Sequence, residues 1–144
     1  MNLMKIAHVP PVSVDLTASV ADAVKAMVNN SVGAVAVVDQ GTLRGIFSER
    51  DVMKKVIYHN LPPENTPVVE VMTAEVESVR AEMQPAEALR LMVDRHFRHL
   101  PIVDNEGKVL GILSIRNLLQ NLVEELEDSV NSLTSYFGAD GPGG

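Results

Sequence analysis

The pattern of apolar and polar positions predicts two strand-helix units. Residues 12–14 and 76–79 read VSV and VESV, and each is predicted to be a short extended segment. Each is followed by apolar residues at helical spacing, opened by Ser19 in the first unit and by Pro85 after Gln84 in the second. Both stretches carry an acid in the first turn, which is typical of a helix start.

Short apolar runs rich in β-branched residues follow both helices. AVAVVD precedes LRGIF in the first half, and LPIVD precedes VLGIL in the second, with a glycine-containing turn between the two runs. Runs this brief are typical of strands. A second helix is predicted from Asp51 to about Tyr58 and from Arg116 to about Leu126. Both halves therefore have the order β-α-β-β-α.

The two halves also repeat residue by residue. A shift of 65 positions aligns Ser13 with Ser78 and Asp39 with Asp104, and a shift of 66 aligns GIFSERD with GILSIRN because the second turn is one residue longer. A half of about 50 residues buries too little apolar surface to be stable alone, so we expect the halves to pack together. The predicted fold class is α+β, with two β-α-β-β-α repeats packed as a pseudo-twofold pair.

The predicted domain organisation follows from this repeat. Residues 1–62 form the first repeat with an N-terminal segment, residues 63–126 form the second, and residues 127–144 form a helical extension with a disordered glycine-rich tail. Residues 59–70 carry three prolines and no apolar period, which indicates a linker. Within residues 123–137 an apolar stripe has no predicted partner. Its members are Leu126, Val130 and Leu133.

Composition and charge narrow the classes of function. The chain has 144 residues, of which 46% are hydrophobic and 22% charged, as is usual for a globular protein. Its formal charge of −7 opposes binding to nucleic acid, which requires a basic face. No apolar run is long enough to span a membrane, the N-terminus lacks the apolar core of a signal peptide, and cysteine is absent. We therefore expect a cytoplasmic protein that binds neither nucleic acid nor membranes.

The sequence GIFSERDV, residues 45 to 52, admits two interpretations. Ser48 and Asp51 are spaced nearly as in a capping box, so the start of a helix would explain both. An uncovered helix N-terminus is also an anion site, because its first backbone N–H groups lack partners. From the residues alone both interpretations stay open.

Several features together resemble the cystathionine-β-synthase (CBS) domain pair. They are the doubled β-α-β-β-α unit, the segment FRHLPIVD, the two G-x-x-S-x-x-D/N motifs and the VMT sequence at the start of the second copy. The resemblance covers about residues 5–125. It implies two clefts between the halves, adenosine-containing ligands, regulation of another protein, frequent assembly into flat dimers, and no chemistry by the module itself.

The resemblance also implies roles for individual residues. In the family, the motif aspartate of one copy binds the ribose hydroxyls, and basic residues before a strand of the other copy hold the phosphate. An acid that accepts two hydroxyls suits a ribose, and a guanidinium with an imidazole beside a helix N-terminus suits an anion. The first cleft is expected to be lined by Ile46, Ser48, Arg50, Asp51, Val76, Glu77, Arg98, His99 and Pro101.

The second cleft departs from this pattern. Its ribose position is Asn117 in place of an acid, and Gly33 and Ala34 stand where the first cleft has Arg98 and His99. A phosphate there is expected to meet only two polar side chains and the backbone. The weaker cleft is expected to comprise Gly33, Ala34, Ser114, Arg116 and Asn117. One good nucleotide site and one weak or empty site are therefore predicted.

The resulting hypothesis is a regulatory module that senses an adenine nucleotide, with AMP favoured and ADP, ATP or NAD as variants. We expect a homodimer, an unidentified protein partner that reads the ligand-dependent conformation, and no required cofactor. His96 and His99 lie three residues apart, but no third metal ligand is near them in the sequence, so no metal is expected. No phosphate loop or nucleophile elbow is present, and an enzyme is not expected. The alternative is an assembly module that dimerises through its helices and the 123–137 stripe, with vestigial clefts.

Overall fold

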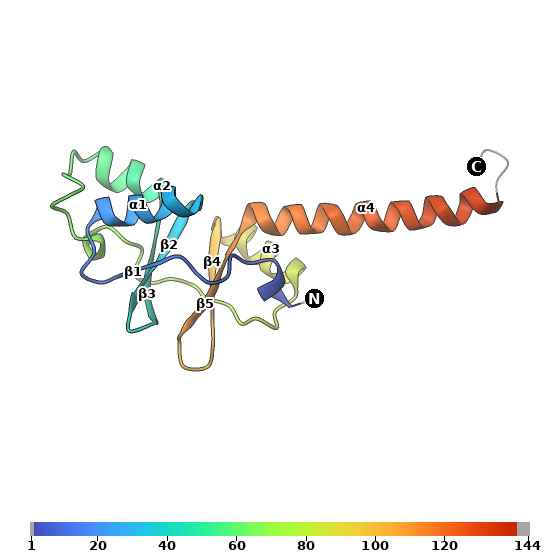
Figure 1. Cartoon of the computed structure of the whole chain (residues 1–144), viewed down its shortest axis with the longest axis horizontal. Coiled ribbons are helices and arrows are strands. Elements are labelled where there is room, and N and C mark those ends of the chain that lie inside the picture. Colours follow the sequence, from blue (N-terminus) through green and yellow to red (C-terminus); the bar gives the residue numbers. More distant parts are fainter. Residues whose placement is uncertain (1, 141–144) are drawn as a thin grey trace.

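Two lobes and a projecting helix make up the chain. The computed structural model describes residues 2 to 140, and the side chains of residues 2 to 135. Figure 1 shows the lobes side by side, each containing strands and helices, with one long C-terminal helix extending from the second lobe. This arrangement confirms the predicted α+β class of two packed repeats.

The first lobe is a three-stranded sheet with helical segments. Its elements in chain order are β1 (Ser13–Asp15), α1 (Val20–Asn30), β2 (Ala34–Asp39), β3 (Thr42–Ser48), α2 (Glu49–Asp51) and the π-helical η2 (Val52–Ile57). β1 pairs with β2 in parallel, and β2 pairs with β3 in antiparallel orientation. Ser19 and Asp22 form a capping box that begins α1, which confirms the predicted start. The second helix begins at Glu49, two residues before the predicted position.

The second lobe repeats this order with a smaller sheet. Its elements are α3 (Pro85–Arg95), β4 (His99–Val103), β5 (Val109–Ser114) and α4 (Ile115–Asp140). β4 and β5 pair in antiparallel orientation. The strand predicted at residues 76–79 is wrong apart from its last residue, because only Val79 pairs, through one parallel bridge to Ile102.

A proline explains why the second sheet lacks its third strand. In the first lobe the backbone N–H of Ala36 donates to the Val12 carbonyl at 2.9 Å and helps to hold the leading strand. The equivalent residue in the second lobe, after the shift of 65, is Pro101. Proline has no backbone N–H, so the corresponding bond to Glu77 cannot form.

The two lobes exchange their connecting segments. The short helix η1 (Leu3–Lys5) contributes the fully buried Leu3 to the core of the second lobe. The short helix η3 (Val68–Glu70) contributes the fully buried Val68 to the core of the first lobe. The segment predicted to be a linker, residues 59–70, is therefore partly a core element. Each core therefore contains a residue from the segment that precedes the other repeat in the sequence.

Two equivalent glycines allow these segments to pass close to the sheets. A Cβ at Gly45 would lie 2.5 Å from the Met72 sulfur and 2.8 Å from the Thr73 carbonyl oxygen. A Cβ at Gly111 would lie 3.2 Å from the His8 carbonyl oxygen. Gly45 is thus required by the backbone that runs beside it, and Gly111 lets its neighbouring backbone approach more closely than a Cβ usually allows.

The helix α4 continues without a break from the second repeat into the C-terminal extension. The predicted helix at residues 116–126 and its continuation over residues 123–137 are one element of 26 residues, about 39 Å long. None of the helices within residues 2–140 is both long and apolar enough to cross a membrane. The tail predicted to be disordered, GADGPGG, begins at Gly138, but α4 continues to Asp140, so this prediction is wrong for residues 138–140. Residues 141–144 and the side chain of Phe137 lie outside the described residues. The domain ranges 1–62, 63–126 and 127–144 stay a prediction.

Candidate functional site

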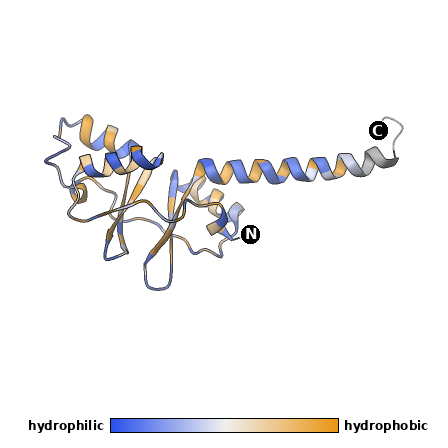
Figure 2. Ribbon diagram, viewed as in Figure 1, coloured by the Kyte–Doolittle hydropathy of each residue, from blue (hydrophilic) through white to orange (hydrophobic). Residues whose placement is uncertain are grey.

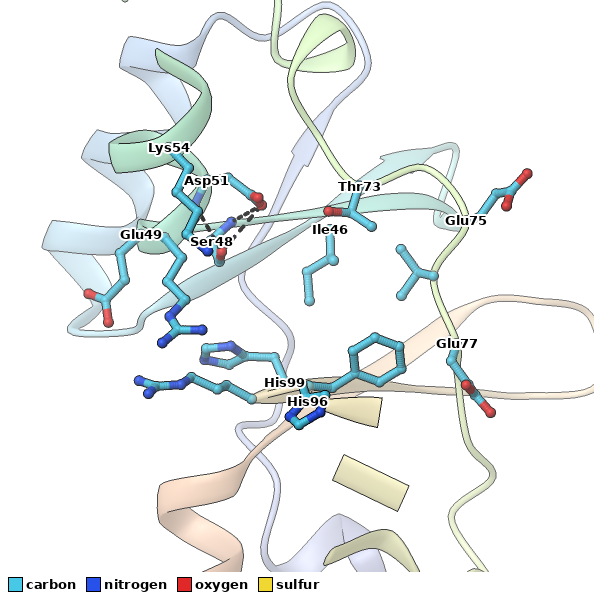
Figure 3. Close-up of a pocket in the computed structure, with 14 residues that line it drawn as sticks. Ile46, Ser48, Glu49, Asp51, Lys54, Thr73, Glu75, Glu77, His96 and His99 are labelled. Atoms are coloured by element: carbon cyan, nitrogen blue, oxygen red, sulfur yellow. Dashed lines mark hydrogen bonds between the residues drawn. The ribbon is translucent and has the colours of Figure 1, made fainter. Parts of the chain in front are cut away.

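A cleft of about 230 Å³ lies where the two lobes meet, and it brings together eight of the nine residues predicted for the first site. We call it the first cleft. It is lined by Ile46, Ser48, Glu49, Arg50, Asp51, Lys54, Thr73, Glu75, Val76, Glu77, His96, Phe97, Arg98 and His99. Figure 3 shows Ser48 and Asp51 on one wall and His99 and His96 on the opposite wall. The carboxylate and the cation predicted to converge, Asp51 and Arg98, do line one crevice.

Asp51 both caps a helix and lines the first cleft. Its Oδ2 accepts hydrogen bonds from the backbone N–H of Ser48 at 3.0 Å and from the Ser48 hydroxyl at 3.2 Å. Its Oδ1 pairs with Lys55 Nζ at 3.3 Å, and its side chain is 14% exposed. The capping interpretation is therefore correct, and the carboxylate faces the cleft at the same time.

A second capping box shows that capping alone does not indicate a ligand. Ser19 and Asp22 make the same reciprocal hydrogen bonds at the start of α1, each at 3.1 Å. Neither residue lines the first cleft or the larger cleft described below. Position in the cleft distinguishes Asp51 from Asp22, and hydrogen-bond geometry does not.

The wall from the second lobe presents a guanidinium and an imidazole. Arg98 is exposed, and His99 is half-buried at the start of β4. Burial lowers the pKa of His99 below its usual value of 6.5, the nearby Glu49 carboxylate opposes this effect, and the Arg98 charge adds to it. An anion in the cleft would favour the protonated imidazole in the same way as Glu49 does. His99 is thus placed to take up a proton when an anion binds.

The side chain of Glu77 is held away from the centre of the first cleft (Figure 3). The Glu77 carboxylate forms a salt bridge with Arg95 Nη1 at 2.9 Å. Figure 3 shows the carboxylates of Glu75 and Glu77 directed away from Ser48 and His99. This leaves the backbone and the Val76 side chain as the nearest parts of this segment to a bound molecule.

Pro101 is the one predicted residue that does not line the first cleft. It is buried within β4, where its carbonyl accepts a hydrogen bond from the Val79 N–H at 3.0 Å. The structure places it within the buried strand and not in the cleft lining, so its predicted place in the lining is wrong.

A second cleft, of about 660 Å³, lies on the other side of the β4 entry and contains all five residues predicted for it. It is lined by His8, Val12, Ser31, Val32, Gly33, Ala34, Glu49, Arg98, His99, Ile112, Ser114, Ile115, Arg116, Asn117 and Gln120. Asn117 donates its backbone N–H to Ser114 Oγ at 3.1 Å without a reciprocal side-chain bond. The start of α4 therefore keeps the serine cap but lacks a counterpart of the Asp51 carboxylate.

The cation content of the second cleft corrects the sequence prediction. Arg98 and His99 line both clefts, so the second cleft is not restricted to Arg116 for positive charge. The repeat comparison missed this sharing because it assigned each residue to one equivalent position. Position 33 lies next to these shared side chains, since a Cβ there would lie 3.4 Å from His99 Nε2 and 3.3 Å from Glu49 Oε1.

Sequence reasoning missed six residues of the first cleft. They are Glu49, Lys54, Thr73, Glu75, His96 and Phe97. Lys54 lies one helical turn after Asp51, and Phe97 and His96 directly precede Arg98, so sequence neighbourhood could have indicated these three. Thr73 ends the VMT sequence, and its backbone exchanges hydrogen bonds with Ile46 at 2.9 and 3.0 Å. No group of three or more metal-ligating side chains occurs among the described residues.

These observations define a class of protein: a tandem-repeat module with ligand-sized clefts between its lobes. Comparison with known proteins gives the family. The CBS domain family model matches residues 4–58 and 68–124, and the chain belongs to this family. Both repeats identified from the sequence are thereby confirmed.

Relatives and solved structures agree with this assignment. The chain is 34% identical over 124 residues to the mitochondrial CBS domain-containing protein CBSX3 of Arabidopsis thaliana, covering 83% of this chain and 60% of that protein. A CBS-domain protein from Burkholderia ambifaria MC40-6 superposes with a TM-score of 0.77 at 32% identity, covering 86% of this chain and 95% of that one. The CBS domain pair of protein MJ0100, solved with 5′-methylthioadenosine and S-adenosyl-L-methionine, gives a TM-score of 0.79 at 21% identity, covering 87% and 98%. The last likeness concerns the fold alone.

Proposed function

We propose that this chain is a regulatory module that binds an adenine nucleotide, with AMP favoured, in the first cleft. The observation that carries the proposal is the convergence of Asp51 from the first lobe with Arg98 and His99 from the second. A carboxylate suits a ribose diol, and a guanidinium beside an imidazole suits a phosphate. A molecule that satisfies both walls must carry both hydroxyls and an anion.

The apolar part of the first cleft supports a base as the third component. Ile46, Val76 and Phe97 contribute apolar surface between the polar walls. Apolar and aromatic side chains with a few polar groups are typical of small-molecule sites. The solved complex of MJ0100 with two adenosine derivatives supports an adenosine-type ligand by analogy.

Charge and volume favour AMP over ligands with more phosphates. The carboxylates of Glu75 and Glu77 are directed away from Ser48 and His99 (Figure 3), which leaves Glu49 and Asp51 against three permanent cations, Arg50, Lys54 and Arg98. Each additional phosphate would bring further negative charge into this set. The volume of about 230 Å³ is also below the range of roughly 300–1,000 Å³ usual for ligand pockets, which favours the smallest of the four nucleotides.

A bound nucleotide would act by bridging the lobes. Its ribose would contact the start of α2 and its phosphate the start of β4, so its affinity would depend on the relative position of the two lobes. Only such differential affinity shifts a conformational equilibrium. A partner protein would read the shifted state. The partner's identity, the cytoplasmic location and the absence of enzymatic activity remain part of this proposal.

A melting experiment with AMP, ADP, ATP and NAD tests the proposal. Each nucleotide is added to the full chain up to millimolar concentration, and calorimetry gives the stoichiometry. We expect AMP to give the largest stabilisation, with one strongly bound molecule per chain, and Asn117→Ala to leave this stabilisation nearly unchanged. Absence of a shift with all four nucleotides refutes nucleotide binding, and an equal loss in Asn117→Ala refutes the asymmetry between the clefts.

A further inference from the structure

An exposed apolar stripe runs along α4 at the spacing of a coiled coil. It consists of Leu119, Val123, Leu126, Val130 and Leu133, which we call the α4 seam. These positions are separated by four, three, four and three residues. Their side chains are between 44% and 66% exposed. Figure 2 shows hydrophobic bands recurring along this helix between hydrophilic ones.

Residues 123–135 of α4 are exposed and do not pack against another part of the chain that the structure describes. Leu118 is fully buried and Leu122 packs against the second-lobe core, whereas every residue from 123 to 135 is exposed. A single helix of this length that touches nothing is marginally stable in water, because helices in proteins are stabilised mainly by packing of an apolar face. The seam therefore requires an occupant.

We infer that the occupant is the same helix of a second copy, paired in parallel as a two-stranded coiled coil. When the seam positions are assigned, valine occupies both described a positions, 123 and 130, and leucine occupies the d positions 119, 126 and 133. A β-branched residue at a with leucine at d favours two parallel strands.

Charge distribution selects a second copy over a basic partner helix. Positions e and g flank the seam and contact the partner, and they are Gln120, Leu122, Glu127, Ser129 and Thr134. Only one of these is charged, so the flanks offer little to attract a basic helix. The remaining acids, Glu124, Glu125 and Asp128, fall at positions b, c and f, which point away from a partner and do not repel one across the seam.

Pairing through α4 would connect assembly directly to the clefts. The first residue of α4, Ile115, donates its backbone N–H to the Arg98 carbonyl at 2.8 Å, and the first turn of α4 lines the second cleft. The inference does not depend on nucleotide binding, because no residue of the α4 seam lines either cleft.

Charge placed in the seam tests the pairing. The double variant Leu126→Glu/Val130→Glu adds two acids within the seam, and the matched control Asn131→Glu/Ser132→Glu adds two acids at b and c of the same helix. All four positions are exposed, so both variants retain the lobes, which circular dichroism checks. We expect light scattering to give the unsubstituted chain and the control at least twice 15.6 kDa, and the seam variant half their mass. A monomeric unsubstituted chain, or equal masses for both variants, overturns the inference.

Single cysteines test the parallel orientation, because the chain has no cysteine of its own. Leu119→Cys and Leu133→Cys are oxidised separately, with Ser132→Cys as a control at position c. A parallel pair brings each d residue beside its counterpart, so both seam variants are expected to form covalent dimers and the control is not. These two positions are about 21 Å apart along the helix, so an antiparallel pair cannot crosslink both to themselves. Crosslinking at one position only, at neither, or equally in the control overturns the parallel assignment.

Discussion

Removal of the Asp51 side chain separates its capping role from its proposed ligand role. Asp51→Ala abolishes the capping box with Ser48 and the ion pair with Lys55. Loss of a cap costs about 1 kcal/mol, and loss of an i,i+4 ion pair costs about 0.4 kcal/mol. A domain of this size loses roughly 4 °C of Tm per kcal/mol. Without ligand, Asp51→Ala is therefore expected to melt ~6 °C lower.

The ligand-dependent part follows from the hydrogen bonds that Asp51 would give up. At 100 times Kd, AMP is expected to stabilise the unsubstituted chain by about 2.7 kcal/mol, or ~10 °C. A hydrogen bond to a charged group contributes about 1.5–3 kcal/mol, so its loss weakens binding roughly 10- to 100-fold. At the same AMP concentration the variant should retain about 0.4–1.4 kcal/mol of stabilisation, or ~2–6 °C.

Asp22→Ala is the matched control, because Asp22 forms the same capping box with Ser19 away from both clefts. Differential scanning fluorimetry at constant AMP, with the ligand-free melt subtracted, measures both variants. The control is expected to melt lower without ligand and to keep the full AMP increment. If Asp51→Ala also keeps the full increment, Asp51 is only a cap and the proposed ribose contact is wrong.

Two further outcomes test the packing around the clefts. Gly45→Ala is expected to lower the free energy of unfolding, measured in urea, by about 1–3 kcal/mol, because its Cβ would meet the Thr73 carbonyl. Gly33→Ala would meet only the ends of side chains and should cost less. Equal losses in the two variants contradict this account. Burial lowers the pKa of His99, so between that pKa and 6.5 the unfolded chain binds more protons and stability rises with pH. His99→Gln should flatten the rise in urea midpoint over this window, and an unaltered profile contradicts the assignment.

The repeated elements could be predicted because each depends on local signals. Ser19 caps α1, Pro85 begins α3, and the four brief apolar runs form β2 to β5. Local signals did not reveal the missing strand of the second lobe, because the pattern VESV does not show which partner it would pair with. The absent N–H belongs to Pro101, on another strand.

The exchange of connecting segments could not be predicted from periodicity. An apolar residue such as Leu3 or Val68 is expected to be buried, but the sequence does not say which core receives it. Chain order places residue 3 in the first half, and the structure places it in the core of the second lobe. The sequence shows that Gly45 and Gly111 occupy equivalent positions in the two repeats. Only the structure shows the backbone that passes close to each of them.

Sharing of residues between the clefts couples the two sites, in addition to the difference that Asn117 makes between them. Arg98, His99 and Glu49 line both clefts, so the two sites are adjacent and share these three side chains. A guanidinium that donates to a phosphate in the first cleft has fewer N–H groups left for an anion in the second. A second anion would also meet the charge of the first at short range in a partly desolvated site. Occupancy of the first cleft should therefore oppose binding of a phosphate in the second, even though the second is the larger.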